Sequence, residues 1–288
     1  MNDDYINDFL LYLEMDLNYS KNTIDTYSNA LNHLNNNVNK NILTLSSNDI
    51  EKFISGLNLE SSSVANYLSA FKTFYNYYIK IGKININPID KVDSPKLSKH
   101  LPTFLTVDEV DKLLDIEIKD AFSARNKSLL ELLYATGLRI SELISLEFKN
   151  IDLNDCIVRI MGKGSKERIV PINDLAIKYL KIYVKDYRSK LVKIEQNNFV
   201  YLNNHGKKMT RQGVFRMIKK RTLETGIKKD VSPHTLRHSI ATHMLENGAD
   251  LRIIQEFLGH ESIGTTQIYT HLTNQKLKSD YMEYFPRN

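Results

Sequence analysis

Hydrophobic residues in the first hundred positions recur every three or four residues, which is the period of an amphipathic helix. Four segments show this pattern: Ile6, Phe9, Leu10 and Leu13; Ile24, Tyr27, Leu31 and Leu34; Ile50, Phe53, Ile54 and Leu57; and Val64, Tyr67, Leu68, Phe71, Phe74, Tyr75 and Tyr78. Asn48 and Glu51 have the spacing of a capping box before the third segment. The pattern predicts a four-helix bundle, with the aromatic stripe of the fourth segment in its core.

The helical pattern stops at Gly82, and a different composition follows. Three prolines and three lysines punctuate this stretch: Pro88, Pro95, Pro102, Lys91, Lys96 and Lys99. Such a composition is typical of an extended basic linker. We therefore expect an N-terminal domain at residues 1–86, a linker at 87–104 and a second domain at 105–288.

The second domain also begins with helical signals. Thr106 and Glu109 have the spacing of a capping box and precede a short apolar run. Residues 121–136 carry a dense stripe of leucines that stops at Gly137, a residue type that ends many helices. Arg139 follows this stop, and Ser141 and Glu142 mark the start of a new helix.

The period then changes to two, which indicates strands. Residues 156–160 and 167–172 alternate in this way, and the glycine-bearing stretch 162–166 joins them as a hairpin turn. Asn173 and Thr210 are suited to cap two further helices. The sequence predicts a mainly α fold: a helical bundle, then an α-rich domain with a small antiparallel sheet.

The region from Ser232 to Tyr269 holds the strongest chemical signal. Ser232 and Pro233 are a helix start, and they put His234 and Arg237 side by side on the first turn. An imidazole, a guanidinium and the positive end of a helix together suit a phosphate group. Asp250 and Gly259 bound a second helix, so His260 lies just past its end.

Composition limits the class of protein and its partners. The chain has 288 residues and a single cysteine, Cys156, which fits a reducing cytoplasm. The acidic N-terminus is unlike a signal peptide, and no apolar run approaches the roughly 20 residues that span a bilayer. Residues 1–100 carry 9 Lys and 11 acidic residues, a net charge of −2, whereas the remainder carries +7. We expect a cytoplasmic protein whose second domain binds a polyanion.

The predicted helix that starts at Thr210 concentrates part of this positive charge. Its exposed side carries Arg211, Arg216, Lys219, Lys220 and Arg221. This face is our candidate for contact with the backbone of a nucleic acid.

Five sequence motifs follow one another along the chain. They are Ala135-Thr-Gly-Leu-Arg139-Ile-Ser-Glu142-Leu, Gly162-Lys163-Gly164-Ser-Lys-Glu-Arg, Ser232-Pro-His234-Thr-Leu-Arg237-His, Leu258-Gly-His260 and Thr266-Gln-Ile-Tyr269-Thr-His. The sequence resembles the tyrosine site-specific recombinases of the phage integrase family, and among them the bacterial Xer type.

The resemblance implies a catalytic role for six residues. Tyr269 would be the nucleophile that forms a 3′-phosphotyrosyl link, and Arg139 and Arg237 would hold the non-bridging phosphate oxygens. Lys163 would be the general acid for the leaving 5′-oxygen. His234 and His260 would position the phosphate and manage the tyrosine proton. No cofactor, metal or ATP is expected.

Two of these assignments, and the role of Glu142, have alternatives. Lys166 competes with Lys163 as the general acid, and only the family pattern selects Lys163. Glu142 is either a plain helix cap or the residue that braces Arg139. His234 and His238 stand four apart, as in zinc-protease helices, but the acid that those helices need is Thr235 here, so we expect no metal site.

The resemblance also implies partners. The expected substrate is duplex DNA with a specific recombination site, contacted by Arg211, Arg216, Lys219, Lys220 and Lys166. The expected assembly is a homo- or hetero-tetramer on two paired sites. A paralogous recombinase and a DNA translocase that activates the enzyme are candidate partners, and no membrane is involved.

Three functions compete at this point. The favoured one is a recombinase that resolves chromosome or plasmid dimers through a Holliday junction, at chromosome segregation and cell division. The second is an integrase of a phage or mobile element, although the first predicted helix starts near Asp4 and leaves no room for an arm-binding domain. The third is a catalytically silent DNA-binding protein, which the complete set of six catalytic residues argues against.

The C-terminal residues carry one more apolar stripe. Leu277, Tyr281 and Phe285 are four residues apart, which indicates one face of a short helix. So short a helix needs a groove to cover this face. The groove belongs either to its own domain or, as the resemblance implies, to an adjacent protomer.

Overall fold

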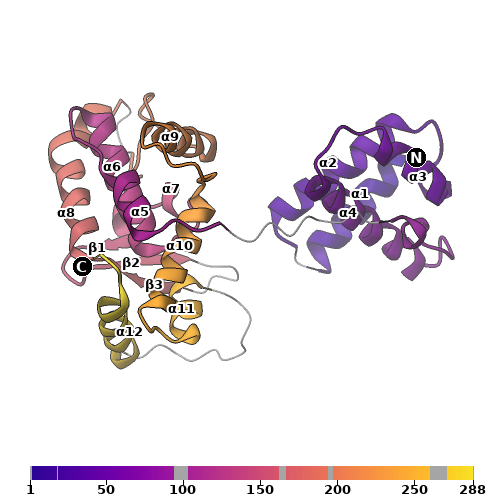
Figure 1. The fold of residues 1–288 in the computed structure, drawn as a ribbon. Helices are drawn as coiled ribbons and strands as arrows, with labels where there is room; N and C mark the ends of the chain where they lie inside the picture. Colours follow the sequence, from indigo (N-terminus) through magenta and orange to yellow (C-terminus); the bar gives the residue numbers. More distant parts are fainter. Residues whose placement is uncertain are drawn as a thin grey trace. The chain divides into compact units, whose positions relative to one another are not determined.

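The computed structural model describes residues 2–17, 19–93, 103–161, 167–193, 197–259 and 271–287, with side chains from residue 278 onward in the last range. The chain divides into two compact units, Met1–Lys99 and His100–Asn288 (Figure 1). Each unit has its own hydrophobic core. Within the described residues, no helix is both long enough and apolar enough to cross a membrane.

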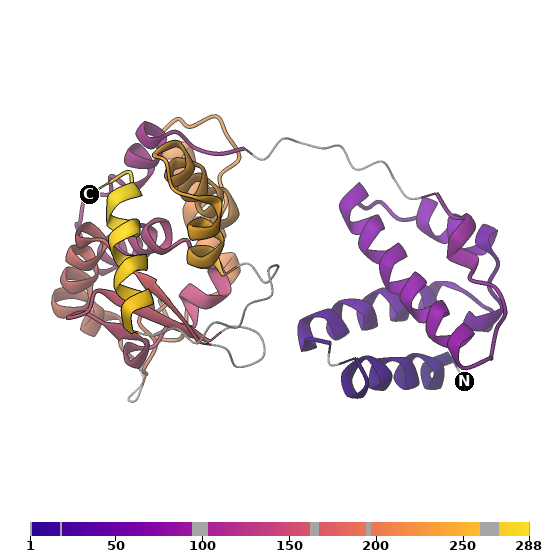
Figure 2. The ribbon, with the colours of Figure 1, turned by 90° about the horizontal axis from the view of Figure 1, so that it is seen from below.

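Four α-helices build the first unit, as the hydrophobic pattern predicts. They are α1 (Asn2–Met15), α2 (Lys21–Asn37), α3 (Ser47–Ser55) and α4 (Ser61–Lys80). Helix α2 contacts both α1 and α4 (Figure 2). The aromatic stripe of α4 is core: Phe71, Phe74, Tyr75 and Tyr78 are buried. The buried hydroxyl of Tyr75 donates to the Ile42 carbonyl at 2.8 Å, so a polar atom enters this core without losing its hydrogen bond.

Two details of the first unit differ from the sequence-based expectation. Helix α3 is capped by Ser46 and Asp49, which form a reciprocal capping box two residues before the predicted pair. The expected linker begins with residues that fold back onto the bundle: Pro88–Lys91 form a 3-10 helix against α3 and α4, with Pro88 and Ile89 buried. Pro88 and Ile89 are buried against the apolar surface of the bundle, and this segment is therefore folded rather than extended. The domain boundaries themselves remain a prediction.

The second unit is mainly helical with one small sheet (Figure 1). Its helices are α5 (Val107–Leu114), α6 (Ala121–Thr136), α7 (Ile140–Ile144), α8 (Asp174–Ile182), α9 (Arg211–Glu224), α10 (Pro233–Glu246), α11 (Leu251–Leu258) and α12 (His271–Tyr284). A π-helical turn, Tyr183–Tyr187, and a 3-10 helix, Arg188–Leu191, continue the chain directly after α8. The mainly α fold with a small antiparallel sheet is confirmed.

The sheet has three antiparallel strands in the order β1 (Ile151–Asp152), β2 (Ile157–Met161) and β3 (Glu167–Pro171). The predicted hairpin is β2–β3, with Ile157 opposite Pro171 and Met161 opposite Glu167. The two-residue strand β1 was not predicted, because so short a segment has no readable period. The turn at 162–166, which contains Lys163 and Lys166, lies outside the described residues.

Helix α6 is the centre of the second unit. It contacts α5, α8 and α10, and it is buried along almost its whole length. A helix covered on every side must pair its charged groups internally. Lys127 and Glu131 do so: the Lys127 ammonium lies 3.0 Å from the Glu131 carboxylate and donates to the Leu114 carbonyl at 2.5 Å.

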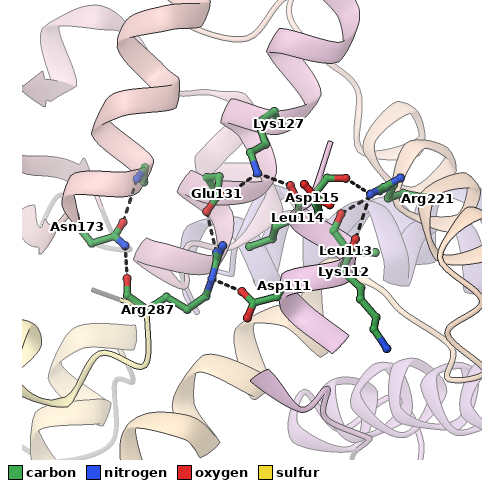
Figure 3. Close-up of polar contacts among 11 residues, drawn as sticks. Asp111, Lys112, Leu113, Leu114, Asp115, Lys127, Glu131, Asn173, Arg221 and Arg287 are labelled. Atoms are coloured by element: carbon green, nitrogen blue, oxygen red, sulfur yellow. Dashed lines mark hydrogen bonds and ion pairs between the residues drawn. The ribbon is translucent and has the colours of Figure 1, made fainter. Parts of the chain in front are cut away.

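The C-terminal segment packs on its own unit. Tyr281 and Phe285 are buried, and the Tyr281 hydroxyl donates to the Ala135 carbonyl at 3.0 Å. Arg287 pairs with Glu131 at 2.8 Å and Asp111 at 2.6 Å (Figure 3). Of the two grooves considered for this apolar stripe, Tyr281 and Phe285 occupy that of their own domain. The side chain of Leu277 lies outside the described part.

Candidate active site

Arg139 sits at a sharp corner between two helices. Gly137 ends α6 in a left-handed conformation, with φ of 54°, and Arg139 is the N-cap of α7 two residues later. The Arg139 guanidinium donates to the Glu142 carboxylate at 3.2 Å and to the Gly259 carbonyl at 3.3 Å. It keeps 43% of its side-chain surface exposed, and among the described residues its remaining donors are available to a ligand.

Arg237 reaches the same place from α10, and it is buried. Its guanidinium donates to the Gly137 carbonyl and, at 2.6 Å, to the Leu258 carbonyl. Burial and the neighbouring charge of Arg139 lower the pKa of Arg237 to about 10, so this guanidinium is still charged at neutral pH. The two arginines thus converge on the consecutive carbonyls of Leu258 and Gly259, at the end of α11.

Two glycines make this convergence sterically feasible. A Cβ on Gly137 would lie 2.7 Å from Leu258 Cδ2, and a Cβ on Gly259 would lie 2.9 Å from Arg168 Cδ. Both residues also have positive φ, which other residue types rarely adopt. Glycine at position 137 therefore lets the end of α6 approach α11, and glycine at position 259 lets the end of α11 approach Arg168 on β3.

Glu142 connects the site to the sheet. Both of its oxygens accept hydrogen bonds from Arg168 on β3, at 2.9 and 2.8 Å, which is a bidentate pair. Its carboxylate also accepts from the Arg139 backbone amide at 2.8 Å, so it caps α7 and braces Arg139 together. Burial alone would raise the pKa of Glu142, but hydrogen bonds and charge from Arg168 outweigh it, and the pKa lies below its usual value.

Arg168 is the residue of this group to which sequence reasoning gave no role. It stands at the end of the second motif, Gly162 to Arg168, so its position was visible. Its partner Glu142 is 26 residues away in the sequence, and no local sequence pattern predicts a contact between residues so far apart.

His234 lies near Arg237 on the first turns of α10, as the Ser232–Pro233 helix start predicts. It is exposed. A groove of about 380 Å³ runs between α10 and α11 and is lined by His234, Arg237 and His238 together with apolar side chains. An imidazole and a guanidinium at one groove suit an anionic ligand.

The other histidines of α10 have structural partners. His243 is buried, accepts a hydrogen bond from the Tyr134 hydroxyl at 2.7 Å and donates to the Leu105 carbonyl at 2.8 Å. Burial lowers the pKa of His243, in keeping with the neutral ring that this pattern requires. The His238 ring meets Phe104 edge-on, at 6.3 Å between centroids. In the described ranges, no cluster of His, Cys, Asp or Glu has the arrangement of a metal site.

Four of the predicted site residues, Lys163, Lys166, His260 and Tyr269, lie outside the described residues. The structure therefore brings together Arg139, Glu142 and Arg237, and places His234 at the adjoining groove. Gly259, which precedes His260 in the chain, lies directly against Arg139 and Arg168.

Helix α9 presents the predicted basic face. Arg211, Arg216, Lys219 and Lys220 are all exposed. Arg221 is a correction: it turns away from this face and donates to the carbonyls of Lys112, Leu113 and Asp115, which end α5 (Figure 3). Those carbonyls have no partner within their own helix, and a long cationic side chain satisfies them.

Two guanidiniums lie together at the end of α11, and the same unit carries a basic helix. This arrangement is suited to binding phosphate groups. Two family models match the chain: "Phage integrase family" over residues 103–276 and "Phage integrase, N-terminal SAM-like domain" over residues 6–82. The chain belongs to the phage integrase family.

Curated relatives are similar over almost their whole length. Tyrosine recombinase XerD of Oceanobacillus iheyensis is 43% identical over 291 residues, covering 98% of this chain and 98% of the relative. Tyrosine recombinase XerD of Listeria monocytogenes serovar 1/2a is 41% identical, with 99% of each chain covered.

Solved structures share the fold. The XerH recombinase bound to its palindromic difH substrate has a TM-score of 0.68 and 26% identity, covering 89% of this chain and 78% of that one. The Tn1549 transposon integrase in complex with circular intermediate DNA has a TM-score of 0.72 at 19% identity, with 94% and 98% covered, and this likeness concerns the fold alone.

Proposed function

We propose that the protein is a tyrosine recombinase that cuts and rejoins duplex DNA at a specific site and resolves chromosome or plasmid dimers. The observation that carries this proposal is the convergence of Arg139 and Arg237 on the Leu258 and Gly259 carbonyls, beside a groove that His234 lines. Its support is the nearly full-length similarity to proteins named tyrosine recombinase XerD.

The two arginines would stabilise the reacting phosphate. Attack on a phosphodiester builds negative charge on the non-bridging oxygens, and guanidiniums fixed in advance lower the energy of that state. Backbone carbonyls already orient Arg237, and Glu142 already orients Arg139. Little reorganisation would be needed when DNA binds.

Tyr269 would supply the nucleophile. Its phenolic oxygen attacks phosphorus, the bond to the 5′-oxygen breaks, and a 3′-phosphotyrosyl link forms. His234 and His260 would take up the phenol proton, while Lys163 would give a proton to the 5′-oxygen. The link keeps the free energy of the broken bond, so a 5′-hydroxyl from the partner duplex can reverse the step and produce a Holliday junction.

DNA contact would fall to Arg211, Arg216, Lys219, Lys220 and Lys166. The first four are exposed on α9, where their cationic groups can meet phosphates; Lys220 also lies 3.9 Å from the exposed Glu224 carboxylate. Strand exchange between two sites requires four protomers, which are either copies of this chain or pairs with a paralogous recombinase. A DNA translocase is a further candidate partner.

The nucleophile is the sharpest test. A nicked suicide substrate, which loses the fragment that would reverse the reaction, should trap a covalent protein–DNA adduct. Tyr269→Phe should abolish this adduct while leaving DNA binding within about twofold, because only the reacting oxygen is removed. An adduct that survives in the Phe variant would contradict the assignment.

The choice between Lys163 and Lys166 has its own test. A substrate with a 5′-phosphorothiolate at the cleaved bond has a sulfur leaving group that needs little protonation. Lys163→Ala should lose at least about a hundredfold in cleavage rate on normal DNA, the usual scale of general acid catalysis. Most of that loss should disappear on the sulfur substrate. Rescue of Lys166→Ala instead would identify the other lysine.

A further inference from the structure

Helix α9 carries an exposed aromatic residue within its basic face. Its inner side is filled by Val214, Ile218 and Thr222, which are buried. Its exposed residues fall into two ridges at intervals of four: Arg211, Phe215, Lys219 and Leu223, and beside them Gln212, Arg216, Lys220 and Glu224. Phe215 is therefore flanked along its own ridge by two cations, one turn away on either side.

Phe215 differs from the other exposed phenylalanines in the described part of the chain. Three phenylalanines there are more than a third exposed, namely Phe122, Phe148 and Phe215. The rings of Phe122 and Phe148 are covered by the guanidiniums of Arg125 and Arg188, at 5.2 and 4.7 Å. No such cation or ring contact covers Phe215 among the described residues, and 40% of its surface is exposed.

A partly exposed ring between cations fits the major groove of duplex DNA. The cations supply attraction to phosphates, which carries no sequence information. A phenyl ring that reaches the floor of the groove can contact the 5-methyl group of thymine, an apolar group that the other three bases lack. The position suits this role, because recognition helices enter the groove with their N-terminal residues and Phe215 lies in the second turn of α9.

We propose that Phe215 is a specificity-determining residue that reads a thymine methyl group in the recombination site. The inference rests on the proposed function, since it requires that α9 faces DNA. It adds a direct base contact to a face otherwise described by charge alone.

The experiment removes one methyl group at a time. The preferred site is first selected from a random duplex pool with the wild-type protein. Each thymine of that site is then replaced singly by deoxyuridine, and affinities are measured for the wild type and for Phe215→Ala. Wild-type affinity should fall about three- to tenfold at one thymine, the scale of one lost apolar contact. Phe215→Ala should bind both forms of that site equally.

Two control variants separate base reading from general effects. Leu223→Ala removes an exposed apolar side chain from the far end of the same ridge, and Phe122→Ala removes an exposed aromatic from α6. Both should keep the full deoxyuridine penalty. Phe215→Leu, which retains an apolar side chain, should keep part of it and guards against an Ala variant that fails to fold.

The results distinguish failure of the Phe215 proposal from failure of the proposed function. If no thymine shows a penalty, or if the penalty persists in Phe215→Ala, Phe215 does not read a methyl group. Such a result leaves the recombinase proposal standing, provided that the Tyr269-dependent adduct still forms. If the wild type forms no adduct and selects no sequence, the proposed function itself fails.

Discussion

Glu142 holds two guanidiniums on one carboxylate, and this sharing determines the environment of the candidate site. Arg168 takes the stronger, bidentate position, while Arg139 uses one side-chain donor and stays partly exposed. A carboxylate already neutralised by Arg168 attracts Arg139 less strongly. It can therefore orient Arg139 without competing fully with a phosphate for its charge.

Glu142→Gln tests how much the shared carboxylate contributes to stability. Losing the carboxylate leaves Arg168 mostly buried with a weaker acceptor, so the free energy of unfolding should fall by about 2 kcal/mol at pH 7. Because the folded-state pKa of Glu142 is lowered, its stabilisation is present above the unfolded value of about 4.3 and is lost as the pH falls through the folded value. Urea unfolding at several pH values measures both effects.

The matched control for this change is Glu117→Gln. Glu117 pairs with Lys119 at 2.8 Å, but both side chains are at least 70% exposed, so this ion pair adds little stability. Equal losses for the two variants would contradict the role given to Glu142. So would a Glu142→Gln deficit that stays unchanged at pH 3.

Helix starts were among the most predictable features, because caps are local, although the α3 cap lies two residues before the predicted pair. Ser232, Asp250 and Thr106 begin helices as expected, and each side chain accepts the predicted hydrogen bond from a backbone amide. Contacts between distant segments were not predictable in this way. In the sequence, Arg221 is indistinguishable from the other basic residues of its helix, and only the structure shows that it binds the carbonyls at the end of α5. Likewise, only the structure shows that Arg168 on β3 pairs with Glu142 on α7.

The stop at Gly137 shows how a local signal also carries a long-range constraint. Its left-handed conformation is what the sequence predicts for the end of α6, but the packing of Leu258 against its Cα is known only from the structure. Gly226 provides the comparison: its φ of 70° is equally left-handed, and a Cβ there would meet nothing within 4 Å.

Gly137→Ala should therefore cost more than Gly226→Ala. The second variant carries only the conformational penalty of about 1 kcal/mol. The first adds a clash with Leu258 and a shift of the Gly137 carbonyl that orients Arg237, for a total of about 3 kcal/mol. Thermal unfolding measures the difference, and suicide-substrate cleavage should fall only for Gly137→Ala. Equal stability losses would show that the ends of α6 and α11 can separate without cost.

At the scale of the whole chain, the two units contribute different properties. The sequence predicts a bundle with net charge −2 followed by a domain with +7, and each unit has its own core. The candidate site lies entirely in the second unit, as far as its residues are described. Tyr281 and Arg287, near the C-terminus, complete the core of that unit by contacting Ala135 and Glu131 of α6.

The C-terminal contact makes a prediction about the stability of one unit alone. Glu131 is 2% exposed and lies between Lys127 and Arg287, so removing Arg287 leaves a buried carboxylate with half of its compensation (Figure 3). Arg287→Ala should lower the free energy of unfolding of the second unit by about 2–4 kcal/mol. Lys278→Ala is the control on α12, since that ammonium donates to the exposed Asp155 carbonyl at 3.0 Å and is not part of the Glu131 cluster.

Hydrogen exchange with peptide resolution can follow the two units in one intact chain. Peptides from α6 and α12 should lose protection in Arg287→Ala, whereas those from α4 should keep it, because the N-terminal bundle has a separate core. Truncation after Asn274 should have a larger effect of the same kind, since it also removes Tyr281 and Phe285 from the core. Unchanged protection of α6 in both variants would mean that the C-terminal segment does not stabilise its own domain.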